Sequence, residues 1–300
     1  MKDQAERLRE IISNIKNYKD EEKKTNVLTE NPRSRVIAIT SGKGGVGKTN
    51  FTVNLAIKFA QMGLRVVIID ADLGLANVDV VMGKMSKYNL SDVINSSKDI
   101  LEILEEGYDG VKFVSGGSGV QELVRLNRTQ LVDLLMKLGR LDEEADVVLI
   151  DTGAGLSENV ISFVHAAQEV ILVTTPEPTS ITDAYALIKT ITHRDKAKNI
   201  KVVVNRADNA VEAYNILDKL NIVTQKFLGV KLQKLGYILN DACVTKAVKI
   251  QQPFVISFTR SEASKNMNDI ALTLMDNKEL SPNSVSGIKM FINKLTSLFN

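Results

Sequence analysis

Residues 36–49, VIAITSGKGGVGKT, constrain the fold of this chain more than any other stretch. A short apolar run rich in β-branched residues leads into a glycine-dense loop, and a helix-forming segment follows directly. The spacing Gly42-x-x-x-x-Gly47-Lys48-Thr49 fits a phosphate-binding P-loop, and the strand before it and the helix after it supply the expected context. Glycines let the backbone curl so that consecutive N–H groups point at phosphate oxygens, and a helix N-terminus adds partial positive charge there. The stretch therefore predicts a nucleotide site.

The side chains of the loop have separable expected roles. Lys48 is placed to pair with β- and γ-phosphates, and Thr49 to offer its hydroxyl to Mg²⁺. A glycine-rich turn without a ligand is the alternative, but a Lys-Thr pair at a helix start has no packing purpose. The predicted nucleotide contacts of the loop are Gly42, Lys43, Gly44, Gly45, Val46, Gly47, Lys48 and Thr49.

Two further apolar strands run into acidic residues. Residues 64–69 lead into Asp70 and Asp72, and residues 147–150 lead into Asp151. The carboxyl ends of parallel strands form the ligand-binding edge of such a sheet. We expect Asp151 to hold Mg²⁺, and one of the other two carboxylates to approach the metal while the other faces the γ-phosphate. Capping of the next helix is the alternative for both.

Lys43 adds a second lysine inside the loop and gives the run KGGVGKT. With this lysine, the loop resembles the deviant Walker A motif of the MinD/ParA family of P-loop ATPases, and the resemblance covers residues 35–275. In that family the extra lysine reaches across a dimer interface to the phosphates of the facing subunit. The resemblance therefore implies ATP and ADP as ligands, a homodimer with ATP, and a catalytic role for Lys43. On the residues alone, a solvated loop lysine is an equal alternative.

The resemblance also assigns roles to the acidic residues. Residues 73–79 resemble the family's switch I, which implies that Asp72 holds or activates the hydrolytic water and that Asp70 lies near the Mg²⁺ shell. Residues 151–156, DTGAGL, resemble switch II, in which small residues let a backbone N–H approach the γ-phosphate.

Asn205 and Arg206 end another predicted strand, at the position where the family recognises adenine. An Asn side chain has both a donor and an acceptor for the purine edge, although it is also a common helix cap. The family often has proline where this chain has Leu239, so Asp241 is not carried over as a ligand.

Strands and helices alternate from residue 36 to about 275. This order predicts an α/β fold with a mostly parallel β-sheet covered by helices on both faces, as in a MinD-like P-loop NTPase. Residues 35–275 are accordingly the predicted ATPase domain.

An N-terminal extension precedes that domain. Residues 1–18 are predicted to hold an amphipathic helix and residues 19–34 a polar linker. Periodicity alone leaves open whether the helix docks on a partner or on its own domain. Residues 3–9, DQAERLR, resemble the DQAxxLR activator motif of the flagellar-regulator (FlhG) branch of the family. That resemblance implies that Gln4 and its neighbours stimulate the signal-recognition-type GTPase FlhF, since a glutamine amide can orient an attacking water.

The C-terminal end repeats the arrangement of linker and helix. Residues 276–287 are polar, and residues 288–300 place large apolar residues on one helical face with lysines beside them. This pattern is typical of an interfacial membrane anchor, and MinD-type proteins end in such a helix. The alternative is a helix packed in a groove of its own protein, and both states can hold at different nucleotide stages.

Composition excludes several other classes of protein. A net charge of +2 gives no bulk electrostatic reason to bind nucleic acid, so no specific nucleic-acid partner is expected. A single cysteine rules out an internal disulfide and suits the cytosol. Two histidines and one cysteine make a protein-built zinc site a poor hypothesis. The charged N-terminus does not resemble a signal peptide.

The sequence thus favours an ATP-dependent dimeric switch that associates reversibly with the inner face of the cell membrane. Its expected partners are FlhF and flagellar basal-body components, and its expected output is the number and placement of flagella. The alternatives are a septum-placement MinD, which usually begins almost directly at the P-loop strand, and a ParA-type DNA-segregation ATPase, which would want a basic surface.

Overall fold

The computed structural model describes residues 34–72, 77–95, 98–116, 133–134, 137–276 and 287–298. The chain divides into two units, residues 1–32 and 33–300. Several predicted segments lie outside the described residues: the helix of residues 1–18, residues 19–33 of the linker predicted at 19–34, the start of switch I at 73–76, and residues 277–286 of the linker predicted at 276–287.

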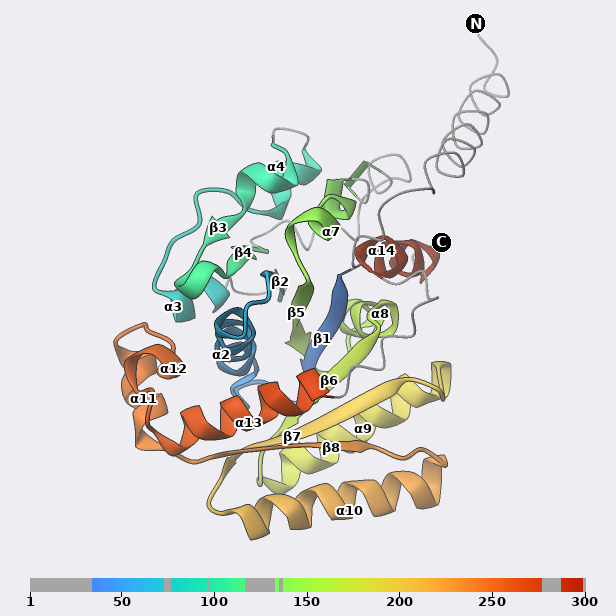
Figure 1. Ribbon diagram of the computed structural model, residues 1–300. Helices are drawn as coiled ribbons and strands as arrows, with labels where there is room; N and C mark the ends of the chain where they lie inside the picture. The colour runs from blue at the N-terminus through green and yellow to red at the C-terminus, as the bar shows by residue number, and fades with distance from the viewer. Residues whose placement is uncertain are drawn as a thin grey trace, which may run out of the picture. The chain divides into compact units, whose positions relative to one another are not determined.

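An eight-stranded sheet forms the centre of the larger unit, in the order β3-β4-β2-β5-β1-β6-β7-β8 (Figure 1). Every neighbouring pair is parallel except β3 and β4. The predicted α/β fold with a mostly parallel sheet is therefore confirmed. The strands are β1 (Arg35–Ser41), β2 (Val66–Ala71), β3 (Glu105–Glu106), β4 (Lys112–Val114), β5 (Val147–Ala154), β6 (Glu169–Thr174), β7 (Asn199–Ala207) and β8 (Gln233–Leu239).

Helices cover both faces of this sheet. They are α2 (Lys48–Gln61), α3 (Asn77–Met82), α4 (Leu90–Ile94), α7 (Leu141–Glu144), α8 (Glu158–Ala166), α9 (Pro178–Arg194), α10 (Ala210–Leu228), α11 (Ala242–Lys249), α12 (Phe254–Ser257), α13 (Glu262–Asp276) and α14 (Ile288–Leu298), with 3₁₀ turns at Ile100–Ile103 and Tyr108–Gly110.

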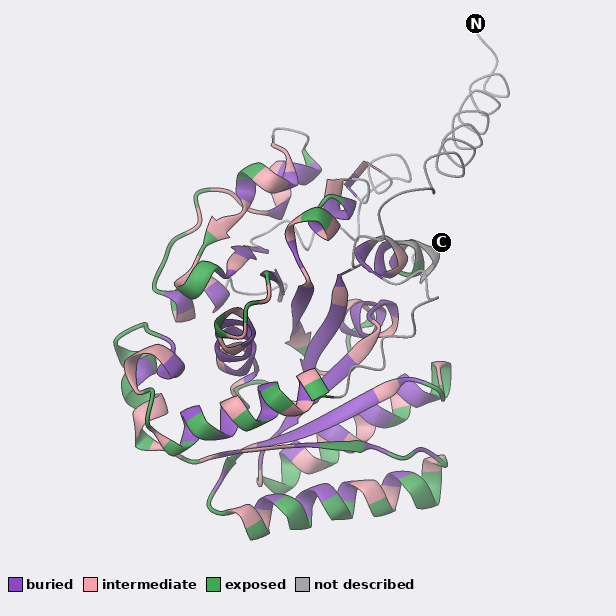
Figure 2. Ribbon diagram, in the orientation of Figure 1, coloured by how far each residue is buried: buried purple, intermediate pink, exposed green. Residues whose placement is uncertain are grey.

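The apolar core has two layers, one on each face of the sheet. Alternate side chains of β1 show this division, because Val36 and Ala38 join one layer and Ile37 and Ile39 join the other. Helices α8, α9, α10 and α14 complete the first layer, and α2, α12 and α13 complete the second. Central strands buried on both faces explain why β1, β2 and β5 read as continuous apolar runs (Figure 2).

The C-terminal helix α14 lies against α8, α7 and β1. Its apolar face is covered, since Ile288, Phe291, Ile292 and Leu295 are each at most 5% exposed. The ring of Phe291 stacks on that of Phe163 with centroids 6.3 Å apart. In this structure the helix is therefore packed against its own protein, which is the second of the two alternatives left open by the sequence. Among the described helices, none combines the length and the apolar character needed to cross a membrane.

Candidate nucleotide site

The glycine-rich loop connects β1 to α2 at the carboxyl edge of the sheet. Gly45 and Gly47 have φ values of 78° and 90°, which L side chains rarely adopt. A Cβ on Gly42 would lie 2.3 Å from the Asp183 carbonyl carbon, so α9 packs directly against the loop. Around Gly44 and Gly45 the space is open. The loop is thus held from one side and leaves its backbone free to cradle phosphate oxygens on the other.

Three donors of α2 converge on the buried carboxylate of Asp151. Lys48 Nζ lies 3.0 Å from Oδ1, Thr49 Oγ1 donates to Oδ2 at 2.7 Å, and Thr52 Oγ1 lies 3.0 Å from Oδ1. Lys48 is only 7% exposed and Asp151 is fully buried. A hydroxyl beside a carboxylate is a suitable oxygen donor set for Mg²⁺, and the ammonium next to it suits phosphate. The structure thus brings together three residues predicted from the sequence, and it adds Thr52, which sequence reasoning missed although it lies one helical turn after Lys48.

Asp70 is fully buried near Asp151 and caps the following helix. Its carboxylate accepts from the backbone N–H of Asn77 at 3.0 Å, of Val78 at 3.2 Å and of Asp72 at 3.1 Å. Burial raises the pKa of Asp70 to about 7, with a further contribution from the negative charge of Asp151. These contacts are those of the helix-capping alternative, and the role of Asp70 near Mg²⁺ stays a prediction.

Asp72 lies at the end of β2 and faces the segment predicted as switch II. A Cβ placed on Gly153 would be 3.6 Å from Asp72 Oδ1, in ordinary van der Waals contact, so the two segments are close neighbours. The role of Asp72 in holding the hydrolytic water stays a prediction, because the next four residues, 73–76, lie outside the described part of the chain.

The second lysine of the loop is held by residues that the sequence did not indicate. Lys43 Nζ lies 2.7 Å from Glu177 Oε2 and 2.9 Å from Thr179 Oγ1, both at the start of α9. The hydrogen bond from Lys43 lowers the pKa of Glu177, and the lysine charge adds to the effect. The signal for Glu177 was its place in the turn after β6, at the same sheet edge as the loop.

Asn205, near the end of β7, contacts the loop, and Arg206 follows it in the chain. Asn205 Nδ2 donates to the Val46 carbonyl at 2.7 Å, and its Oδ1 accepts from the Arg206 N–H at 2.9 Å. The cap of α10 is Asn209, so Asn205 does not serve that purpose. Arg206 has a φ of 59°, a left-handed conformation that is uncommon for a side chain of this size. Adenine recognition by this pair stays a prediction.

Asp241, which was not carried over as a ligand, caps α11 instead. Its Oδ1 accepts from the backbone N–H of Cys243 at 2.8 Å, and its Oδ2 accepts from that of Ala263 at 3.3 Å.

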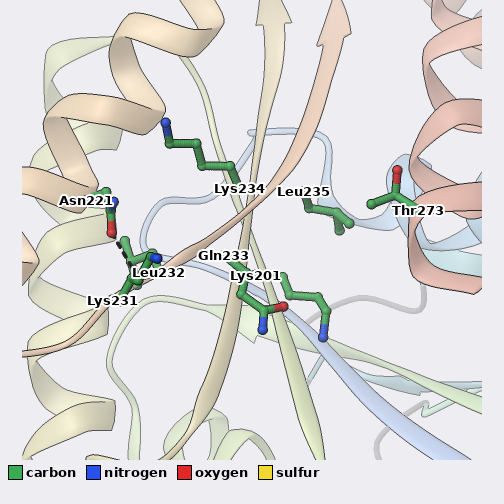
Figure 3. A pocket seen from close by; sticks show the side chains of 8 residues that line it. All are labelled: Lys201, Asn221, Lys231, Leu232, Gln233, Lys234, Leu235 and Thr273. Carbon is green, nitrogen blue, oxygen red and sulfur yellow. Dashed lines mark hydrogen bonds between the residues drawn. The ribbon is translucent and has the colours of Figure 1, made fainter. Parts of the chain in front are cut away.

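A separate pocket of about 410 Å³ lies at the start of β8, at the opposite edge of the sheet from the loop (Figure 3). Two of its lysines are already paired, Lys201 with Glu169 and Lys234 with Asp218. None of the residues predicted to contact nucleotide lines it. Its lining consists of Lys201, Asn221, Lys231, Leu232, Gln233, Lys234, Leu235 and Thr273.

Comparison with known proteins assigns the family. A family model for ParA, described as an NUBPL iron-transfer P-loop NTPase, matches residues 33–275. This chain belongs to the ParA/MinD family of P-loop ATPases.

Relatives of this ParA/MinD ATPase include two flagellar proteins. The antiactivator FleN of Pseudomonas aeruginosa is 43% identical over 261 residues, which cover 87% of this chain and 93% of that protein. The flagellum site-determining protein YlxH of Helicobacter pylori is 30% identical over 298 residues, 98% of each chain. The crystal structure of the cell division ATPase MinD of Pyrococcus furiosus is similar, with a TM-score of 0.66 and 25% identity over 81% of this chain and 99% of that one.

Proposed function

We propose that this ParA/MinD ATPase is an ATP-dependent dimeric switch that regulates the number and placement of flagella. The observation that carries the proposal is the convergence of Lys48 and Thr49 on Asp151, beside a further lysine, Lys43, that an intramolecular ion pair holds. Support for a flagellar role comes from the relatives named FleN and YlxH, each matched over most of its own length.

ATP with Mg²⁺ fits this donor set. The Thr49 hydroxyl and the Asp151 carboxylate would hold Mg²⁺, and Lys48 would turn from Asp151 to the β- and γ-phosphates. Bound Mg²⁺ supplies charge neutralisation on the phosphates. Asp72 would position the attacking water, and the Asn205–Arg206 pair would hold the adenine.

Dimer closure would move Lys43 from its ion pair with Glu177 to the phosphates bound by the other subunit. In the single chain it pairs with Glu177 at the protein surface. In the closed dimer it would leave Glu177 and reach the phosphates bound by the facing subunit, where a cation stabilises the charge of phosphoryl transfer.

Membrane association would depend on α14. The helix now lies in its groove with its apolar face covered. Release in the ATP dimer would expose that face beside lysines, which suits reversible attachment to the inner, anionic face of the cell membrane.

The expected partners follow from the N-terminal motif. Gln4 and its neighbours in DQAERLR would stimulate the GTPase FlhF, and the dimer surface would contact flagellar basal-body components. These residues lie outside the described part of the chain, so this part of the proposal depends on sequence alone.

Sedimentation velocity with Mg-ATP and with Mg-ADP tests the switch. We expect dimers with ATP and monomers with ADP for the parent chain. Lys43→Ala should remain monomeric in both, whereas Lys196→Ala, an exposed lysine at the opposite edge of the sheet, should behave as the parent. A Lys43→Ala variant that dimerises and turns over ATP like the parent would refute the shared-lysine switch.

A second assay separates the flagellar function from septum placement. A synthetic peptide of residues 1–20 should raise the GTPase rate of FlhF, and the same peptide with Gln4→Ala should not. An unchanged FlhF rate with the parent peptide would remove the flagellar part of the proposal.

A further inference from the structure

The two ends of the ATPase unit meet at one carboxylate. Ser34, fully buried, joins the N-terminal extension to β1, and its hydroxyl donates to Asp142 Oδ1 on α7. The backbone N–H of Ile288, the first residue of α14, donates to the same oxygen at 3.0 Å. Chain segments about 250 residues apart in sequence thus depend on a single acceptor.

The free backbone amides in the first turn of α14 need an acceptor from another part of the chain, because the residue before the helix, Gly287, has no side chain to provide one. Gly287 precedes the helix and accepts the first helical hydrogen bond, from the N–H of Phe291 at 3.1 Å. A glycine has no side chain to accept the free amides of the first turn. Asp142 supplies an ionised acceptor at this position, where negative charge also complements the helix dipole.

We infer that Asp142 is a latch, which holds the start of α14 in its groove and couples the docking of that helix to the anchoring of the N-terminal extension at Ser34. The inference rests on the proposed function, in which α14 leaves its groove for the membrane, and it names a residue that sets the balance of that step.

The coupling follows from the sharing of one oxygen. When α14 leaves, Asp142 loses the Ile288 donor and its carboxylate gains access to water. Of the two hydrogen bonds to Asp142 Oδ1, the one from Ser34 then remains, and water can compete with Ser34 for that oxygen. The attachment point of residues 1–33 therefore responds to the position of α14. The apolar contacts of Phe291, Ile292 and Leu295 hold the rest of the helix, so the latch biases the docking and does not determine it alone.

Hydrogen exchange of the amides of residues 288–298 tests the latch in the full chain without nucleotide. Loss of a cap of this kind shifts an equilibrium about 5- to 30-fold. Asp142→Ala should speed exchange of these amides by that factor, and Asp142→Asn, which keeps an acceptor but not the charge, by less. Glu143→Ala, an exposed residue on the same short helix, is the matched control and should leave exchange unchanged. Equal exchange in the Asp142→Ala and Glu143→Ala variants would overturn the latch.

The coupling has its own test in a double-mutant cycle with Ser34→Ala. If the shared oxygen couples the two segments, Ser34→Ala changes exchange of α14 in the parent and has no effect in the Asp142→Ala background. Additive effects would overturn the coupling. Exchange of the β1 and β5 amides shows whether each variant keeps the core of the parent protein. If Asp142→Ala does not keep it, the cycle is measured with Asp142→Asn instead.

Binding to phosphatidylglycerol vesicles separates this inference from the proposed function. Faster exchange of α14 in Asp142→Ala, together with increased vesicle binding without ATP, supports both. Faster exchange without vesicle binding supports the latch and removes the membrane part of the proposed function. Unchanged exchange overturns the latch whatever the vesicles show.

Discussion

Asp151 is held by more than the two residues of the loop motif. Thr52 Oγ1 lies 3.0 Å from Asp151 Oδ1 and 3.0 Å from the Lys48 carbonyl, and its single proton favours the charged acceptor. The carboxylate that would hold Mg²⁺ is thereby oriented before any ligand arrives. Under the proposed function, Thr52 would therefore position the carboxylate that holds the metal.

Replacement of that hydroxyl should weaken both the fold and the metal site. Thr52→Val keeps the shape of the side chain and removes the donor, which should cost about 1.5–3 kcal/mol because a buried charged acceptor loses a partner. Urea unfolding measures this cost, and titration of Mg²⁺ into the ADP-bound protein should show weaker metal binding. Thr52→Ser keeps the hydroxyl and should stay near the parent. Parent-like Mg²⁺ affinity in Thr52→Val would contradict the positioning role.

The ion pair of Lys43 gives a second prediction at this scale. Glu177→Gln removes the charge that holds Lys43 in the single chain, so the ATP-dependent dimer should form at a severalfold lower protein concentration. The effect is modest because the pair is exposed. Analytical ultracentrifugation with ATP measures it, and Glu158→Gln, which breaks another exposed pair with Arg194, is the control. A weaker dimer would mean that Glu177 also acts in the closed state.

At the scale of elements, the C-terminal carbonyls of α8 are bound by a buried lysine, Lys198, which also lies near Lys294 of α14. Lys198 Nζ donates to the carbonyls of His165, at 2.8 Å, and Ala167. Burial lowers the pKa of Lys198 to about 8, with a smaller contribution from Lys294 on α14, while Asp195 opposes the shift. The carbonyls at the C-terminus of α8 thus favour the charged form of Lys198, whereas the positive charge of Lys294 on the docked helix disfavours it.

This shift predicts a rise in stability at alkaline pH. In the unfolded chain, Lys198 keeps its proton up to its ordinary pKa of 10.5, whereas in the folded protein it loses it near 8. Unfolding therefore binds a proton between these values, and the free energy of unfolding should increase with pH over that window. The difference between the parent and Lys198→Met, measured by urea unfolding from pH 7 to 10, isolates the effect from other groups. A constant difference would contradict it.

Elements with a clear local pattern were predictable, and those defined by tertiary contacts were not. The strands β1, β2, β5, β6 and β7 are short apolar runs before polar tips, so their existence followed from the sequence, whereas their order in the sheet did not. At the site, the same reasoning located Lys48, Thr49 and Asp151 together. The partner of Lys43 could not be predicted, since Glu177 is 134 residues away and only the order of strands brings it to the loop.

The position of α14 shows the same limit. Its apolar spacing predicted a helix with one face to cover, and the helix is present. Periodicity does not distinguish a membrane from a protein groove, because both accept the same stripe. In this structure α14 packs against α8 and its first amide donates to Asp142. Both contacts come from other parts of the chain, so the sequence of the helix alone could not predict them.

At the scale of the whole molecule, the nucleotide site and the docked helix are separate features of one sheet. The loop lies at the carboxyl edge, beside the ends of β1, β5 and β7. Helix α14 covers one face and begins near the start of β1, where Ser34 meets Asp142. A ligand at one place can influence the other only if it binds the docked and released states with different affinity.

That condition makes the last prediction reciprocal. If ATP favours release of α14, anionic vesicles must raise the affinity for ATP by the same factor by which ATP raises the affinity for vesicles. Co-sedimentation with phosphatidylglycerol vesicles, with ATP and without nucleotide, gives one factor, and ATP binding with and without vesicles gives the other. Asp72→Ala, which should slow hydrolysis, keeps the ATP state long enough to measure both. Neutral phosphatidylcholine vesicles are the control. If both factors equal one, nucleotide binding and vesicle binding are not coupled, and the membrane step lies outside the ATP cycle.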